Sequence, residues 1–187
     1  MKKLFVVLFL LVLVKAHSQV PNFTLTNVAS GNAVSLDSYS ANQGVVIIFT
    51  SNACPYDEYY RSRIAKLAKD LGDKVPVLLV NSHTESNESV EAMTKKAQQL
   101  GLTVPYLSDK DQSLMKILKA TKSPQAFVLK NDGGKFSVIY TGAVDDNPQV
   151  EGDVRVMYLK DAVNAMLSNQ AVTTAEVRPV GCSIRKK

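Results

Sequence analysis

The stretch that decides the fold is residues 44–64, GVVIIFTSNACPYDEYYRSRI. It opens with an unbroken apolar run, 45–49, which is typical of a strand buried on both faces. A short polar turn leads to Cys54, and Pro55 follows at the first helical position, where its missing N–H costs nothing. Apolar residues then recur at helical spacing until Gly72 ends the pattern. The stretch therefore predicts a central strand, a turn that carries a cysteine, and a helix that begins directly after it.

The rest of the chain alternates between further strands and helices. Its patterns predict a hairpin around 30–32, a strand at 75–80, a helix at 89–100, a brief extended piece at 104–107 and a helix at 111–120. A strand at 126–129, a turn at 131–134 and a strand through Tyr140 are predicted to follow. The last predicted helix covers 153–168, with Asp153 as its N-cap and Val156 facing inward. Strands separated by helices imply a parallel pair with crossover helices, and the later hairpin adds antiparallel strands. The predicted fold class is α/β, a three-layer α/β/α sandwich around a central mixed sheet.

The first 18 residues have the features of a secretory signal peptide. Two lysines precede a continuous apolar run, 4–14, and Ala16-His17-Ser18 offers small residues at the spacing of a cleavage site. An uncleaved membrane anchor is the alternative. We expect an exported protein, periplasmic or extracellular, with a signal peptide at 1–18, one domain at 19–171 and a tail at 172–187 that carries Cys182.

Charge and composition exclude several classes of function. After position 18 the chain holds 19 basic and 17 acidic residues, a net charge of +2, and four of the basic residues lie in the last ten positions. So weak and localised an excess indicates neither a nucleic-acid partner nor a membrane surface, and we expect no stable membrane insertion after signal cleavage. His83 is the one histidine left, in a polar turn where it is expected to be solvated, so the sequence predicts no metal site and no cofactor.

Cys54 is the candidate nucleophile. A thiol at a helix N-terminus is activated because the helix dipole and free backbone N–H groups stabilise the thiolate. Asp57 and Glu58 oppose this effect, since like charge raises a thiol pKa, and Arg61 or Arg63 would offset it. The alternative is a buried, inert thiol or one half of a static disulfide.

Cys182 is the only other cysteine. Asp57 stands where a C-x-x-C motif has its second cysteine, so a disulfide cycle at Cys54 needs a distant partner: Cys182, a second chain or a small thiol. An even cysteine count in an oxidising compartment allows Cys54 and Cys182 to pair. Cys182 would then either resolve the oxidised Cys54 or pin the tail to the domain.

Taken together, several segments resemble the thioredoxin superfamily, and within it the peroxiredoxin-like, redoxin (AhpC-TSA) type. They are VPNFTLTNV (20–28), the strand-turn-helix 45–64, SPQAFVLKNDGG (123–134), the late helix and the tail RPVGCSIRKK (178–187). The resemblance covers nearly the whole chain after the signal.

The resemblance implies a thioredoxin-like fold with Cys54 at the nucleophilic position. It also implies that Pro124, after Ser123, is a cis proline packed against that cysteine. The peroxiredoxin motif P-x-x-x-[TS]-x-x-C is only partly present, because Ser51 fits its hydroxyl position whereas Ile47 replaces its proline.

Three functional hypotheses follow. The first is an exported thiol oxidoreductase with antioxidant activity, in which Cys54 attacks a peroxide or a disulfide, Cys182 resolves the product and an external thiol reduces the pair. The supporting residues would be Ser51, Pro55, Arg61, Ser123 and Pro124. The second is a non-enzymatic binding module with a structural Cys54–Cys182 disulfide, and the third is a partner protein that acts through mixed disulfides alone.

Overall fold

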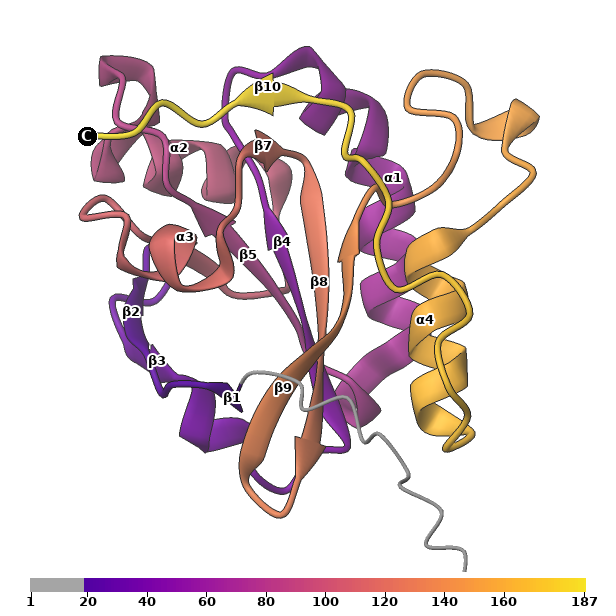
Figure 1. The fold of residues 1–187 in the computed structure, drawn as a ribbon. Helices are drawn as coiled ribbons and strands as arrows, with labels where there is room; N and C mark the ends of the chain where they lie inside the picture. Colours follow the sequence, from indigo (N-terminus) through magenta and orange to yellow (C-terminus); the bar gives the residue numbers. More distant parts are fainter. Residues whose placement is uncertain (1–18) are drawn as a thin grey trace, which may run out of the picture.

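The computed structural model describes residues 19–187, and the predicted signal peptide lies outside this range. An eight-stranded mixed sheet runs through the molecule in the order β1-β9-β8-β4-β5-β6-β2-β3, with a two-stranded β10-β7 ribbon at one end (Figure 1). The strands are β1 (Gln19–Val20), β2 (Thr24–Asn27), β3 (Ala33–Ser35), β4 (Gly44–Phe49), β5 (Val77–Asn81), β6 (Tyr106–Ser108), β7 (Lys122–Ser123), β8 (Gln125–Asp132), β9 (Lys135–Gly142) and β10 (Cys182–Ser183). The helices are α1 (Pro55–Leu71), α2 (Val90–Leu100), α3 (Ser113–Leu118) and α4 (Tyr158–Leu167), with short 3₁₀ turns at Leu36–Tyr39, Gly72–Lys74, Ser86–Glu88 and Glu151–Asp153.

Strand β4 is the centre of the sheet, and all six of its residues are buried. It pairs parallel with β5 and antiparallel with β8. Its alternate side chains enter two separate apolar layers, because successive residues of a strand point to opposite faces. Val46 and Ile48 belong to the layer formed with α1, α2 and α4, whereas Val45, Ile47 and Phe49 belong to the layer formed with α3 and the N-terminal segment. The predicted three-layer α/β arrangement is confirmed.

The start of the last helix differs from the prediction. Asp153 ends a 3₁₀ turn instead of capping a helix, and α4 begins five residues later, at Tyr158. The backbone before the helix is held extended, because Asp146 N–H donates to Val156 O and Leu159 N–H donates to Val144 O. Val156 is consequently exposed and does not face inward as predicted.

The tail, residues 172–187, returns over the domain to the ribbon at β7 (Figure 1). Thr141 of β9 donates its N–H to Ala175 O of the tail and accepts from Val177 N–H, and Ile184 is buried in the α3-side layer. Within residues 19–187, every helix is too short or too polar to span a bilayer.

Candidate active site

Two segments far apart in the sequence meet at the end of β4. In the antiparallel β4–β8 pair Phe49 lies opposite Gln125, so the turn after β4 is placed against the residues that precede β8. Those residues are Ser123 and Pro124, both buried, and the peptide bond between them is cis as the resemblance implied. The sheet register therefore brings Cys54 to Ser123 and Pro124.

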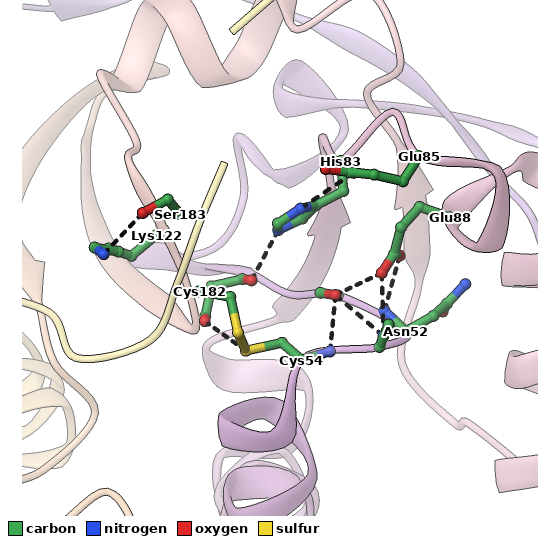
Figure 2. Close-up of a disulfide and its surroundings, with 11 residues drawn as sticks. Asn52, Cys54, His83, Glu85, Glu88, Lys122, Cys182 and Ser183 are labelled. Carbon is green, nitrogen blue, oxygen red and sulfur yellow. Dashed lines mark hydrogen bonds and ion pairs between the residues drawn. A yellow bond between two sulfur atoms is a disulfide. The ribbon is translucent and has the colours of Figure 1, made fainter. Parts of the chain in front are cut away.

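Cys54 forms a disulfide with Cys182, with 6.0 Å between the two Cα atoms (Figure 2). Cys182 reaches this position because β10 pairs with β7, which places Cys182 opposite Ser123. The Cys54 Sγ also lies 3.4 Å from the carbonyl oxygen of Ser123. In the disulfide form this is a contact and not a hydrogen bond, because the sulfur carries no proton. In the reduced form the Cys54 thiol could donate a hydrogen bond to this carbonyl oxygen. Of the three candidate partners for Cys54, namely Cys182, a second chain and a small thiol, the structure therefore shows Cys182.

The exposure of the two sulfur-bearing residues differs. Cys54 is 5% exposed, at the N-cap position of α1, whereas Cys182 is half-buried on the edge of the ribbon. Pro55 occupies the first position of α1, as predicted, and is exposed. A thiolate from solvent consequently reaches Cys182 more readily than Cys54, and Cys54 is the leaving group favoured by the helix N-terminus.

Glu88 organises the turn that carries Cys54. Its carboxylate accepts hydrogen bonds from the Ser51 hydroxyl at 2.6 Å, from Asn52 N–H at 2.8 Å, from Ala53 N–H at 3.0 Å and from Asn81 Nδ2 at 2.7 Å. Ser51 Oγ in turn accepts from Cys54 N–H at 3.1 Å. Burial opposes ionisation, but these hydrogen bonds hold the pKa of Glu88 below its ordinary value. The ionised carboxylate of Glu88 thus holds the Ser51 hydroxyl in place, and Ser51 in turn positions the backbone of Cys54.

Asp57 contributes a second carboxyl group to the site, one helical turn after Cys54. It is 8% exposed, and neither carboxyl oxygen has a hydrogen-bond partner of normal geometry. Burial raises the pKa of Asp57 to about 7, and the nearby hydroxyls of Thr50 and Ser123 offset this only in part. Asp57 can therefore hold or release a proton beside the disulfide near neutral pH.

The prediction that His83 is solvated is wrong. The side chain is 5% exposed, and Nε2 lies 2.8 Å from the Ser123 hydroxyl (Figure 2). Burial lowers the pKa of His83, although Glu88 and Glu85 counteract it. His83 is buried because of its place in the sheet. It follows β5 at the same edge where Cys54 follows β4, and its ring lies against Ser123 of β7.

The two arginines considered as cations for Cys54 have different places. Arg63 is buried in an ion pair with Asp145 at 2.6 Å and also donates to Asn147 O at 2.8 Å, so it anchors the loop before α4. Arg61 pairs with Glu58 and lines a cavity of about 350 Å³ between α1 and the end of α2, a cavity to which Cys54 and Asp57 also contribute. Arg61 is therefore the one of the two that lies beside the site.

The sequence reasoning missed Glu88, His83 and the position of Asp57 in the wall of the site. A signal for His83 existed, since Ser82 and His83 directly follow β5, a buried strand parallel to β4. The carboxyl ends of adjacent parallel strands share one edge of a sheet, where sites are built in α/β folds. Asp57 carries no comparable signal, because a helical carboxylate next to a glutamate is ordinarily solvated.

Comparisons with known proteins agree with this geometry. The family model described as AhpC/TSA family matches residues 16–135. An uncharacterised conserved protein from Geobacillus kaustophilus is 30% identical, with a TM-score of 0.81 over 91% of this chain and 92% of that one.

Two further solved structures extend the comparison. A hypothetical protein from Sinorhizobium meliloti 1021 is 28% identical, with a TM-score of 0.81 over 93% of this chain and 96% of that one. The exposed lipoprotein thioredoxin of Streptococcus pneumoniae TIGR4 is 22% identical, with a TM-score of 0.58 over 80% and 99%, a likeness that shows the fold alone. No curated protein matches the sequence.

Proposed function

Because this chain belongs to the AhpC/TSA family, we propose that it is an exported thiol peroxidase in which Cys54 reduces a peroxide and Cys182 resolves the product. The family and the Cys54–Cys182 disulfide support thiol oxidoreductase chemistry in general. The observation that carries the proposal is this disulfide, made by a cysteine at the N-terminus of α1 and a cysteine 128 positions away, beside Pro124. Export rests on the signal-like residues 1–18 and on the presence of a disulfide.

The proposed catalytic cycle has three steps. The Cys54 thiolate attacks the terminal peroxide oxygen, the O–O bond breaks, and the alcohol or water leaves after taking a proton, so Cys54 becomes a sulfenic acid. The Cys182 thiolate then attacks Cys54 Sγ, and hydroxide leaves and takes a proton to form water. Two external thiols finally reduce the disulfide, the first by attacking the half-buried Cys182 so that Cys54 leaves as a thiolate, the second by releasing the first from Cys182.

Two groups of the site suit the first step. The position of Cys54 at a helix N-terminus favours the thiolate. Asp57, with a pKa near 7, can supply the proton that the leaving alkoxide requires.

Two variants test the proposal. Reduced wild-type protein mixed with hydrogen peroxide should lose two thiols per chain, whereas Cys182→Ser should stop at a sulfenic acid that a 1,3-dione traps at Cys54. Cys54→Ser should consume no peroxide above the buffer rate. Peroxide consumption by Cys54→Ser equal to that of the wild type would overturn the proposal.

A second candidate function is thiol–disulfide exchange with another protein. It is favoured by Arg63, because the guanidinium group is held in a buried ion pair with Asp145 and is not free to bind a peroxide. In that case reduced Cys182→Ser would capture a mixed disulfide at Cys54 and would not react with peroxide. A disulfide that resists mild reductant and, once opened, ignores peroxide would instead indicate the structural bridge of a binding module.

A further inference from the structure

The two cysteines of the disulfide differ in what helps each of them to lose a proton. Cys54 caps α1, and the N-terminus of this helix favours its thiolate. Cys182 belongs to the short strand β10 and has no helix N-terminus of its own. Because the thiolate and not the thiol is the nucleophile, the resolving step needs a group that takes the proton of Cys182.

Ser123 lies next to both Cys182 and the buried histidine of the site. It stands directly opposite Cys182 in the antiparallel β10–β7 ribbon. Side chains of directly opposed residues lie on the same face of a strand pair, with their Cβ atoms about 4.5–5.5 Å apart. The Ser123 hydroxyl is also 2.8 Å from Nε2 of His83. One hydroxyl group is therefore a neighbour of the Cys182 side chain and a partner of the imidazole ring.

The Glu85 carboxylate determines which nitrogen of the His83 ring carries the proton. Nδ1 faces this carboxylate at 3.7 Å (Figure 2). A carboxylate accepts hydrogen bonds and donates none, so the neutral ring carries its proton on Nδ1 and keeps Nε2 as an acceptor. The Ser123 hydroxyl consequently donates to Nε2, and its oxygen lone pairs can accept a hydrogen bond from a thiol.

The charged groups near the ring leave it neutral at pH 7 and able to take up a proton. Burial lowers the pKa of His83 and Lys110 acts in the same direction, whereas Glu88 and Glu85 raise it. These groups, with Asp57 near the Ser123 hydroxyl and Arg185 beside Glu85, come from several segments: Asp57 from α1, Glu85 and Glu88 from the segment after β5, Lys110 from the loop after β6 and Arg185 from the tail.

The ribbon is held by contacts that do not depend on the disulfide. Ile184 is buried and its N–H donates to Thr121 O at 2.9 Å. Gln112, which is fully buried, donates to Arg185 O at 2.7 Å and accepts from Lys187 N–H at 2.8 Å. Cys182 therefore stays opposite Ser123 when the disulfide is open.

We infer that Ser123 and His83 form a proton relay that accepts the thiol proton of Cys182 when this cysteine closes the disulfide. The inference rests on the proposed function in that Cys182 acts as the resolving thiol. His83 does not touch the sulfur and acts through Ser123.

The relay balances the resolving step. The Cys182 S–H bond breaks, its proton passes to Ser123 Oγ, and the hydroxyl proton of Ser123 passes to Nε2 of His83. The Cys182 sulfur bonds to Cys54 Sγ, and hydroxide leaves Cys54. The proton held by the imidazolium then neutralises the hydroxide, so one water has formed and the ring is neutral again.

The test isolates Cys182 in the Cys54→Ser chain, where it is the remaining cysteine. The reduced protein is alkylated with iodoacetamide, and the second-order rate is measured between about pH 5 and pH 10. Near pH 6 the additional change His83→Gln should slow alkylation at least about ten-fold. Near pH 10, where an ordinary thiol is ionised without a base, the two rates should agree within about two-fold. A loss confined to low pH indicates proton transfer, because a structural change would alter the rate at both pH values.

Further variants assign the effect to the relay. In the same Cys54→Ser chain, Ser123→Ala interrupts the relay and should reproduce the effect of His83→Gln, whereas Ser123→Thr keeps the hydroxyl and should retain most of the rate. Ser183→Ala removes an exposed hydroxyl from the next residue of the ribbon, on its opposite face, and is the matched control. Asp57→Asn should leave the rate near pH 6 within about two-fold, since the inference assigns the proton to His83.

A rate near pH 6 that His83→Gln leaves unchanged, or that Asp57→Asn lowers as much as His83→Gln does, would overturn the inference. The measurement involves no peroxide, so its failure is distinguishable from a failure of the proposed peroxidase activity. A wild-type protein that ignores peroxide, while alkylation of Cys182 still depends on His83, would remove the peroxidase and leave the relay.

Discussion

Asp57 brings a carboxyl group into the wall of the site without giving it a hydrogen-bond partner. Its pKa is about 7 in the folded protein against 3.8 in the unfolded chain, so the folded state binds the proton more tightly. The contribution of Asp57 to the free energy of unfolding is fully present below pH 3.8 and is lost as the pH rises through 7. Between about pH 5 and 8 the loss amounts to roughly 2–3 kcal/mol.

Asp57→Asn should remove this pH dependence. Urea unfolding of the disulfide form should be measured at several pH values. The free energy of unfolding of the variant, relative to that of the wild type, should increase as the pH rises. Asp132→Asn, at an exposed turn, makes the same change in charge and should show no such trend. Parallel stability curves for Asp57→Asn and the wild type would contradict the assignment.

Glu88 illustrates the opposite case, a buried carboxylate with four hydrogen-bond donors. Glu88→Gln replaces one acceptor oxygen by an NH₂ group that faces donors, so the free energy of unfolding should fall by about 1–3 kcal/mol. The turn at 51–53 should loosen, and the reduced Cys54 should react faster with iodoacetamide. Glu91→Gln on the exposed side of α2 should change neither quantity.

At the scale of elements, the contact between β10 and β7 depends on Gly181. A Cβ atom at this position would lie 2.1 Å from the carbonyl oxygen of Ser123, whose backbone cannot move freely. Gly181→Ala should therefore displace the ribbon and make the Cys54–Cys182 disulfide at least about ten-fold easier to reduce at equilibrium with dithiothreitol. Gly152→Ala introduces a Cβ atom into open space and should leave the equilibrium unchanged.

The elements also show what the sequence can and cannot predict. The strand β4 and helix α1 follow from local pattern, because the apolar run, Pro55 and Gly72 act within one segment. The start of α4 does not, since residues 154–157 are held extended by the distant segment 144–146. The burial of His83 and the docking of the tail are likewise set by strands that meet only in three dimensions, so a polar turn and an aperiodic tail gave no local sign of either.

The whole molecule is closed by one covalent link that joins positions 128 residues apart. Cys182→Ser, and equally the reduced wild type, should lose about 4–5 kcal/mol of stability in the chain-entropy model. Guanidinium unfolding with and without reductant measures this loss. If the docked tail alone maintained stability, the oxidised and reduced forms would unfold at the same denaturant concentration.

The same link makes most of the chain a ring. A protease that cuts once in the exposed segment 149–153 would leave two fragments still joined while the disulfide persists. On a denaturing gel the nicked, oxidised protein would migrate as one species, and reductant would split it into two. A nicked sample would thus record, molecule by molecule, whether Cys54 was oxidised when the sample was taken.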